Sequence, residues 1–276
     1  MPPIRLAVHG AAGRMGQRVV ALACQDADFT VTVALEGPGH PAIGADAGTL
    51  AGAGELGVHV AAALEDEVQP GTDAPPEADV MIDFSTPEAA VRVAETCAAW
   101  KIPLVLATTG LDESQQAEVL ANAHHIPLLL APNMSLAVNL LMKLSAVAAA
   151  ACKDHPAGVD VEIIDRHHRF KEDAPSGTAL KFGEIIAEVM GQTDHVHGRQ
   201  GRPLHRKKTE IGYHALRVGD NPGEHTIVFG FLGEMIEMTV RATNRDCYAH
   251  GALLAAKNLI DKGPGIYSIN EALGLE

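Results

Sequence analysis

A cluster of titratable side chains lies near the middle of the chain. Residues 162–179 read EIIDRHHRFKEDAPSGTA, and His167, His168 and Lys171 fall within five consecutive positions. Two imidazoles and one ammonium can donate protons and offer positive charge to an anionic substrate. This stretch is therefore a candidate catalytic segment.

The residues that follow this cluster can hold an anion. Ser176, Gly177 and Thr178 come at the predicted start of a helix, near Pro175 or Ser176. A hydroxyl and the unpaired N–H groups of a first helical turn suit a carboxylate. The alternative is structural: PSGT caps the helix, and the preceding charges form a solvated turn.

A second group of residues, near the N-terminus, has the arrangement of a nucleotide-binding loop. Gly10, Gly13 and Gly16 in GAAGRMG follow a predicted strand and open a predicted helix. Glycines at such positions let backbone N–H groups approach a pyrophosphate, whose negative charge the helix dipole favours. Ala12 stands where the commonest fingerprint has its second glycine. A tight strand-to-helix turn is therefore the alternative.

An acidic residue closes the second predicted strand. Glu36 ends TVTVALE about 20 positions after Gly16. Dinucleotide-binding folds place there the acidic residue that accepts hydrogen bonds from the adenine ribose hydroxyls. The alternative is a solvated carboxylate at a strand end. Gly37 follows, where an arginine would neutralise a 2′-phosphate, so the local charge favours NADH over NADPH. Arg14 offers partial compensation.

Two further loops close predicted parallel strands. ATTG spans residues 107–110, and APNMS spans residues 131–135. Ligands of open α/β sheets bind outside the carboxyl ends of the strands, so both loops are candidates for the nicotinamide end of a dinucleotide. Taken alone, each is also an ordinary loop.

The elements that must position these residues change in character along the chain. The first half alternates apolar runs rich in β-branched residues with helix-like stretches, which predicts a Rossmann-type parallel sheet of the α/β class. The runs are apolar almost throughout, as in strands covered on both faces. We expect loops in the glycine-rich stretch 37–57 and in the proline-rich stretch 70–76.

The pattern differs in the second half. Residues 139–152 are apolar almost all round and predict a buried helix at a domain boundary. Runs such as EHTIVFGF and EMIEMTVRA then alternate with a period of two, which indicates an α+β domain whose sheet has one polar face. Residues 247–259 again have helical spacing, and we expect that helix to pack on the first domain.

Composition excludes several classes of protein. The net charge of −14, from 21 basic and 35 acidic residues, disfavours binding to nucleic acid or to an anionic membrane. No apolar run reaches the roughly 18 residues of a membrane span, and MPPIRLAVHG lacks the features of a signal peptide. The four cysteines are scattered without CxxC pairs, as reduced thiols are. We expect a soluble cytoplasmic protein.

Other histidines and basic residues carry weaker signals. His195, His197 and His205 lie close in sequence, but no cysteine or carboxylate accompanies them at metal-ligand spacing. We predict solvated loop residues and no metal. GRQGRPLHRKK, residues 198–208, reads as a solvated basic loop, with an anion or a neighbouring subunit as the alternative partner. Trp100 is expected to pack at a helix end.

The histidine segment resembles a known family, the 4-hydroxy-tetrahydrodipicolinate reductases, also called dihydrodipicolinate reductases. The family's segment runs E-I-I-E-x-H-H-x-x-K-x-D-x-P-S-G-T-A, and this chain departs from it chiefly at Asp165, which keeps the carboxylate. GAAGRMG, DFSTPEA, ATTG, APNMS and RVGDNPGEHT are also similar to family motifs and come in the same order. The resemblance covers nearly the whole chain.

This resemblance implies an activity and a domain organisation. The activity is the NADH- or NADPH-dependent reduction of 4-hydroxy-tetrahydrodipicolinate to tetrahydrodipicolinate, in diaminopimelate and lysine biosynthesis. Residues 1–136 and 245–276 would form the dinucleotide-binding domain, and residues 137–244 the substrate-binding and oligomerisation domain. Members of the family are usually homotetramers joined through the sheets of their central domains. The substrate is a small cyclic dicarboxylate, which needs charge and amide donors, and the enamine that forms on reduction needs a proton.

The resemblance also implies residue roles. His167 would be the catalytic proton donor or acceptor, and Lys171 the proton donor. His168, Gly177 and Thr178 would hold the substrate. The residues implied to contact the dinucleotide are Gly10, Ala11, Ala12, Gly13, Arg14, Met15, Glu36, Ala107, Thr108, Thr109, Ala131, Pro132, Asn133 and Met134. Gly37 stands where relatives with dual cofactor use often carry arginine, which again favours NADH.

Two other functions remain open at the level of sequence. An aspartate or homoserine dehydrogenase-like enzyme has a similar cofactor half, but HHRFKEDAPSGTA argues against it. A non-catalytic NADH sensor would keep the glycine loop, although the presence of His167 and Lys171 argues for catalysis.

Overall fold

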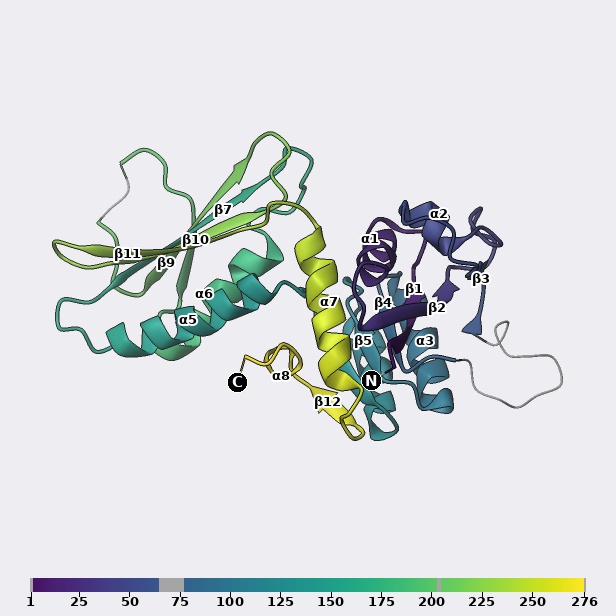
Figure 1. Cartoon of the computed structure of the whole chain (residues 1–276). Coiled ribbons are helices and arrows are strands. Elements are labelled where there is room, and N and C mark those ends of the chain that lie inside the picture. Colours follow the sequence, from purple (N-terminus) through teal and green to yellow (C-terminus); the bar gives the residue numbers. More distant parts are fainter. Residues whose placement is uncertain (1, 65–76, 203–204, 276) are drawn as a thin grey trace. The chain divides into compact units, whose positions relative to one another are not determined.

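Two units make up the chain in a computed structural model that describes residues 2–64, 77–202 and 205–275. One unit combines Met1–Leu136 with Arg245–Glu276, and the other is Ala137–Asn244 (Figure 1). The proline-rich stretch 70–76, expected to be a loop, lies outside the described residues.

The first unit is built on a parallel sheet. Its described part has seven strands in the order β12-β6-β5-β4-β1-β2-β3, and every pair of neighbours is parallel. The strands are β1 (Ile4–His9), β2 (Phe29–Leu35), β3 (Val60–Ala61), β4 (Val80–Asp83), β5 (Leu104–Leu106), β6 (Pro127–Leu130) and β12 (Gly265–Tyr267). β4 and β5 are buried at every position, as expected when helices cover both faces. The predicted α/β architecture is confirmed.

Helices cover both faces of this sheet. Alternate residues of β1 point to opposite sides, so that Leu6 and Val8 pack with one set of helices and Ala7 with the other. The first set contains α1 (Arg14–Ala23), α7 (Asp246–Leu259) and α8 (Ile269–Ala272). The second contains α3 (Pro87–Trp100), α4 (Glu113–Ala121) and the short 3₁₀ helix η2 (Asn122–His124). The late helix α7 thus shares a core with α1, and Trp100 packs at the end of α3.

The glycine-rich stretch is not all loop. It contains the short helix α2 (Ala47–Ala51), whose N-cap Asp46 accepts the N–H of Thr49 at 2.8 Å. The same carboxylate accepts the N–H groups of Leu56 and Gly57, which closes the segment on itself. The prediction of a loop was therefore wrong at α2, because one capping aspartate offsets the low helix propensity of the glycines.

The second unit has a mixed sheet with helices on one face. The described strands run in the order β11-β10-β7-β9-β8, in which β7 is parallel to β9 and antiparallel to β10. They are β7 (Asp160–His167), β8 (Asp194–His197), β9 (Glu210–Arg217), β10 (Glu224–Gly230) and β11 (Met235–Arg241). Figure 1 shows α5 (Leu136–Cys152) and α6 (Gly177–Met190) on the same side of this sheet.

The burial of the strands and of α5 differs in part from the prediction. β7 alternates between buried and accessible residues as expected, but β9 and β10 each begin with four buried residues. Their polar side chains there are buried because they form ion pairs and hydrogen bonds. The all-round burial predicted for α5 was wrong, since Leu140, Leu144 and Val147 are exposed. An apolar composition does not tell which side of a helix meets its core. No helix among the described residues has the length and apolarity to cross a bilayer.

Candidate active site

The glycine loop joins β1 to α1 in a conformation that only residues without a Cβ can adopt. Gly10 has a φ of +76°, and a Cβ there would lie 2.4 Å from the Phe84 carbonyl oxygen. A Cβ on Gly16 would lie 2.1 Å from the Gly10 carbonyl oxygen. α1 starts after Gly13 without a side-chain cap, so no capping side chain satisfies its first-turn N–H groups. The loop therefore offers backbone donors to an anion.

Glu36 lies across this loop. Its carboxylate accepts the N–H of Ala12 and the N–H of Gly37, each at 3.1 Å. A carboxylate has about four acceptor positions, so capacity remains for ribose hydroxyls. The residues present thus fit a dinucleotide: the first-turn amides of α1 have no side-chain cap, and an acid stands at the end of β2.

A buried network fixes the neighbouring loop, ATTG. Asp83 is fully buried, with His9 Nδ1 at 2.6 Å from one carboxylate oxygen and Thr108 Oγ1 donating to the other at 2.5 Å. The Ser85 N–H donates to Thr108 Oγ1 at 2.8 Å. The side chain of Thr108 is committed to this network, so any contact with a dinucleotide would come from its backbone. Asp83 opens the DFSTPEA motif, but nothing in the sequence indicated that it pairs with His9.

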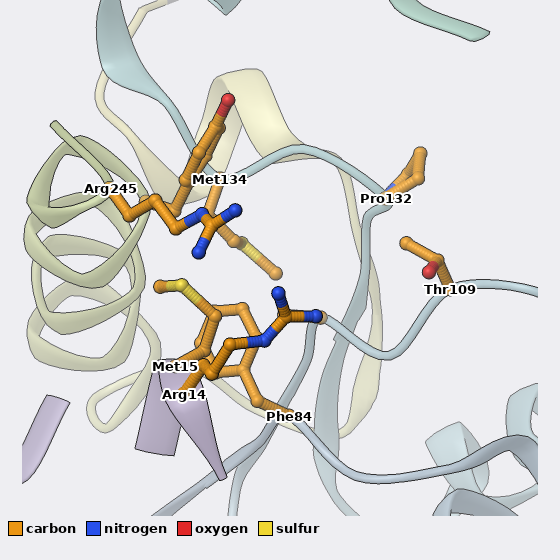
Figure 2. A pocket seen from close by; sticks show the side chains of 9 residues that line it. Arg14, Met15, Phe84, Thr109, Pro132, Met134 and Arg245 are labelled. Atoms are coloured by element: carbon orange, nitrogen blue, oxygen red, sulfur yellow. The ribbon is translucent and has the colours of Figure 1, made fainter. Parts of the chain in front are cut away.

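A cavity of about 280 Å³ opens beside these loops (Figure 2). The guanidinium groups of Arg14 and Arg245 both point into it, and neither forms an ion pair with a carboxylate of the described residues. The other lining residues are Met15, Phe84, Ala107, Thr109, Pro132, Met134 and Tyr248. Two unpaired cations facing one space suit a phosphate-bearing ligand.

The cavity brings together only part of the predicted set. The predicted contacts that line it are Arg14, Met15, Ala107, Thr109, Pro132 and Met134. Those that do not are Gly10, Ala11, Ala12, Gly13, Glu36, Thr108, Ala131 and Asn133. Asn133 instead accepts the Ser135 N–H at 2.9 Å, which shapes the APNMS loop. Sequence reasoning missed Phe84, Arg245 and Tyr248, although DFS at the end of β4 gave a signal for Phe84.

Glu36 lines a separate cavity of about 340 Å³. Gly37 lies there too, and the charged residues that α3 contributes are Arg92 and Glu95. Arg14, considered as a compensating charge for Gly37, lines the other cavity. The arginine that shares a cavity with Gly37 is therefore Arg92.

The candidate catalytic segment lies in the second unit, at the end of β7. His167 and Asp165 point to the same buried face of the strand, and Asp165 Oδ1 lies 2.5 Å from His167 Nδ1. The contact has the distance of an ion pair but not the angle of a hydrogen bond. His225, directly opposite Asp165 on β10, completes a buried group. Burial of the imidazole lowers the pKa of His225 to about 4, so His225 is neutral at physiological pH.

The helix start that follows is as predicted. Ser176 is the N-cap of α6, and its Oγ accepts the Ala179 N–H at 3.2 Å. The Ser176 N–H donates to Asp165 Oδ2 at 2.6 Å. Capping and a link to β7 therefore occur together, so the structural and functional interpretations of PSGT are compatible.

Lys171 and Gly177 share an internal partner. Lys171 Nζ lies 2.7 Å from Asp173 Oδ1, and the backbone N–H of Gly177 also donates to the Asp173 carboxylate. Partial burial disfavours the charged form of the Asp173 carboxyl group, but these two partners stabilise it, so the pKa of Asp173 is lowered. A carboxylate thus already contacts two of the groups expected to hold the substrate. His168 Nδ1 is buried and has no hydrogen-bond partner in the described chain.

Three residues of this unit that could ligate a metal ion lie close together. Ligand atoms of Asp165, His167 and His225 lie within 4.8 Å of one another. Arg217 Nη2 donates to Asp165 Oδ2 at 3.2 Å, so a guanidinium already neutralises this carboxylate and disfavours a second cation beside it.

The prediction for the other histidines was wrong in one respect. His195 and His197 are exposed, as expected, but they lie on β8 rather than in a loop and stack on Tyr213, whose hydroxyl is 2.7 Å from His195 Nδ1. The described part of the basic stretch 198–208 is a mostly exposed loop, as expected, and Arg199 and Arg206 tie it to the sheet through Glu162. Residues 203–204 of that stretch lie outside the described residues.

The fold and the two half-sites define a class. A parallel sheet with a glycine loop and an acid after its second strand, joined to a unit bearing a histidine–lysine cluster, is an NAD(P)-dependent oxidoreductase. Family models described as dihydrodipicolinate reductase, N-terminus, and dihydrodipicolinate reductase, C-terminus, match residues 4–134 and 137–273. The chain belongs to the dihydrodipicolinate reductase family.

Individual relatives agree with this assignment. A 4-hydroxy-tetrahydrodipicolinate reductase of Rhodopirellula baltica is 53% identical over 276 residues, covering 99% of this chain and 97% of the relative. One of Alkalilimnicola ehrlichii is 44% identical over 274 residues, covering 98% and 99%. The solved structure of a dipicolinate-bound dihydrodipicolinate reductase from Paenisporosarcina sp. TG-14 has a TM-score of 0.75 and 26% identity, covering 98% of both chains.

Proposed function

We propose that this protein reduces 4-hydroxy-tetrahydrodipicolinate to tetrahydrodipicolinate, with NADH as the favoured cofactor and NADPH as the second. The observation that carries the proposal is the arrangement of one unit: His167 at the end of β7, Lys171 in the following loop, and the start of α6 tied to the same strand through Asp165. Family membership and the named activity of relatives up to 53% identical support it.

The second unit binds the substrate and supplies the proton. A cyclic dicarboxylate would meet the ammonium of Lys171, the imidazole of His168 and the N-terminus of α6 at Gly177 and Thr178. Either Lys171 or His167 donates the proton that the developing enamine needs. Substrate would displace Asp173 from Lys171, since both carboxylates require the same ammonium.

The first unit binds the dinucleotide, which supplies the hydride when bound. Within the loop from Gly10 to Met15, the first-turn amides of Arg14 and Met15 would hold the pyrophosphate, because the N–H groups of Gly10 to Gly13 already donate to acceptors of the protein. Glu36 would hold the adenine ribose. The loops at Ala107–Thr109 and Ala131–Met134 would flank the nicotinamide end. These roles rest on the unsatisfied first-turn amides of α1 and on the position of Glu36 beside the loop.

The charge around Glu36 supports the preference for NADH. Its cavity holds the carboxylates of Glu36 and Glu95 against the single guanidinium of Arg92. A 2′-phosphate placed there would meet more negative than positive charge, whereas ribose hydroxyls can donate to Glu36.

The assembly is proposed to be a homotetramer joined through the central sheets. Helices α5 and α6 cover one face of the mixed sheet, and its edge strand β11 leaves Met235 and Ile236 exposed. Such exposed apolar residues suit burial against a second copy. The free state of the four cysteines supports a reducing compartment, the cytoplasm.

A steady-state assay tests the function and the cofactor together. Substrate is generated from pyruvate and aspartate semialdehyde, and oxidation of NADH and of NADPH is followed separately. Turnover that requires the fresh condensation product, with a higher kcat/KM for NADH, is expected. Absence of turnover with both cofactors would reject the function, and a higher kcat/KM for NADPH would reject the preference alone.

A further inference from the structure

One buried carboxylate connects the parts of the proposed substrate site. Asp165 is 1% exposed, and its two oxygens face different partners. Oδ1 contacts the imidazole of His167 at 2.5 Å, whereas Oδ2 accepts the Ser176 N–H at 2.6 Å. The first partner is the predicted proton-transfer residue, and the second is the N-cap of the helix that would bind the substrate carboxylate.

Arg217 extends the connection to the loop that carries Lys171. It lies at the end of β9, opposite His167 in the sheet register. Its Nη2 donates to Asp165 Oδ2 at 3.2 Å and to the carbonyl oxygen of Asp173 at 2.5 Å. Asp165 and the guanidinium of Arg217 therefore together connect β7, the start of α6 and the loop that carries Lys171.

His225 closes the back of this group. Its Nε2 lies 3.0 Å from Ser176 Oγ and 3.9 Å from Asp165 Oδ1, and its imidazole meets His167 edge to face at 5.3 Å. Because it is neutral, it does not compete as a cation for Asp165. The imidazole of His167 is thus packed on one side and contacts the carboxylate through Nδ1.

The edge of the His167 ring that carries Nε2 lies beside a glycine. A Cβ on Gly223 would lie 3.0 Å from His167 Nε2, so the absence of a side chain there leaves room beside that nitrogen. The contact does not have the angle of a hydrogen bond, but an unprotonated Nδ1 would set its lone pair against a carboxylate oxygen 2.5 Å away. In the neutral imidazole the proton is therefore expected on Nδ1, which leaves Nε2 as the reactive nitrogen.

We propose that Asp165 is a positioning residue that sets the tautomer of His167 and holds it in register with the N-terminus of α6 and the Lys171 loop. The inference rests on the proposed function. It explains the geometric need for a carboxylate at this point of β7: two oxygens are needed to hold an imidazole and a helix start at once. An amide offers only one acceptor oxygen.

Three variants test the proposal by steady-state kinetics. Asp165→Asn keeps the shape but loses one acceptor and the charge, and it is expected to lower kcat by about 10- to 100-fold. The Kd for NADH is expected to stay within about twofold, because the dinucleotide residues belong to the other unit. Asp165→Glu restores a carboxylate and is expected to recover most of kcat.

The matched control is Glu224→Gln. Glu224 is also a buried carboxylate of this sheet, 4% exposed, but its carboxylate pairs with Arg166 and Arg241, to which no role in the site is assigned. Its kcat is expected to stay within about threefold of the unmodified enzyme. Equal losses in Asp165→Asn and Glu224→Gln, or an Asp165→Glu variant no better than Asp165→Asn, would overturn the proposal.

A spectroscopic measurement covers the case in which Asp165→Asn does not fold. In ¹⁵N-histidine-labelled unmodified enzyme, the His167 signal, assigned by its absence in His167→Gln, is recorded at a pH alkaline enough to leave the imidazole neutral, and it is expected to show a proton on Nδ1 and none on Nε2. The reverse tautomer would overturn the proposal without any Asp165 variant. Failure of the proposed function is distinguishable, because the unmodified enzyme would then show no turnover while the tautomer stayed as expected.

Discussion

The two half-sites are constructed differently. The proposed dinucleotide half depends on backbone: three glycines, an uncapped helix and one carboxylate that accepts two amides. The proposed substrate half depends on buried charge, with a carboxylate, two imidazoles and a guanidinium from β7, β10 and β9. The first half is sensitive to added atoms, and the second to lost charges.

The two halves should therefore be disrupted by different kinds of substitution. A backbone cradle fails when a side chain fills it, since close packing leaves no room for a Cβ. A buried charge network fails when one member is removed, because its partners lose compensation. Substitutions in the two units should therefore produce separate defects, one in cofactor affinity and one in turnover.

Lys171→Ala is expected to have the largest effect. Loss of a proton donor and of a positive charge at the substrate should lower kcat by about 10²- to 10⁴-fold. NADH affinity, measured by fluorescence titration, should survive, because Lys171 is in the second unit. The control is Arg169→Ala, an exposed neighbour in the same loop. Unchanged turnover would remove Lys171 from the mechanism.

The pH dependence of stability tests the charge network. The pKa of His225 falls from 6.5 to about 4 in the folded protein, chiefly because of burial, with Lys171 and Arg217 also lowering it and Asp165 opposing. The unfolded chain therefore binds the extra proton first. The stabilising contribution is present above pH 6.5 and is lost as the pH falls towards 4, by up to about 3 kcal/mol.

Urea unfolding between pH 7 and 4 measures this loss. His225→Gln is the control, since it removes the titrating group, and the difference between the two curves should shrink across that window. A constant difference would contradict the prediction. Asp165, whose pKa is lowered in the fold, acts below this window: its stabilisation is present above a pH of about 4 and lost as the pH falls further.

Gly16→Ala tests the backbone cradle. The added Cβ would lie 2.1 Å from the Gly10 carbonyl oxygen, which should destabilise the fold by about 1–3 kcal/mol and weaken NADH binding. Gly37→Ala is the matched control, because no heavy atom lies within 4 Å of a Cβ there, and its effect should stay within about 0.5 kcal/mol. Similar losses in Tm for both variants would show that glycine content, rather than packing, matters.

Gly37→Arg should have the smallest effect. A guanidinium beside a 2′-phosphate is expected to raise kcat/KM for NADPH by about tenfold, the equivalent of one charge-assisted hydrogen bond. Gly37→Gln, of similar length without charge, should give no gain. If Gly37→Arg also gives none, while Arg92→Gln lowers NADPH use, then Arg92 is the residue that governs the choice.

Local patterns were sufficient for much of this molecule. The parallel sheet follows from apolar runs alternating with helical stretches, and the helix start at Gly177 follows from PSGT, because both signals depend on neighbours in the chain. The loop prediction failed at α2, where Asp46 holds residues up to 11 positions away. The burial prediction failed at α5, because composition does not define which side meets the sheet.

The sequence alone determined the family, the glycine loop, Glu36 and the histidine–lysine segment, because each is a short run whose spacing sets its own geometry. Only the tertiary structure revealed the partners of those residues: His225 and Arg217 beside Asp165, Asp83 beneath Thr108, and Arg245 facing Arg14. The two members of each pair are at least 25 positions apart in the sequence, the separation of Thr108 and Asp83 being 25. Strand register and helix packing bring such residues together, and no local pattern records which strands become neighbours.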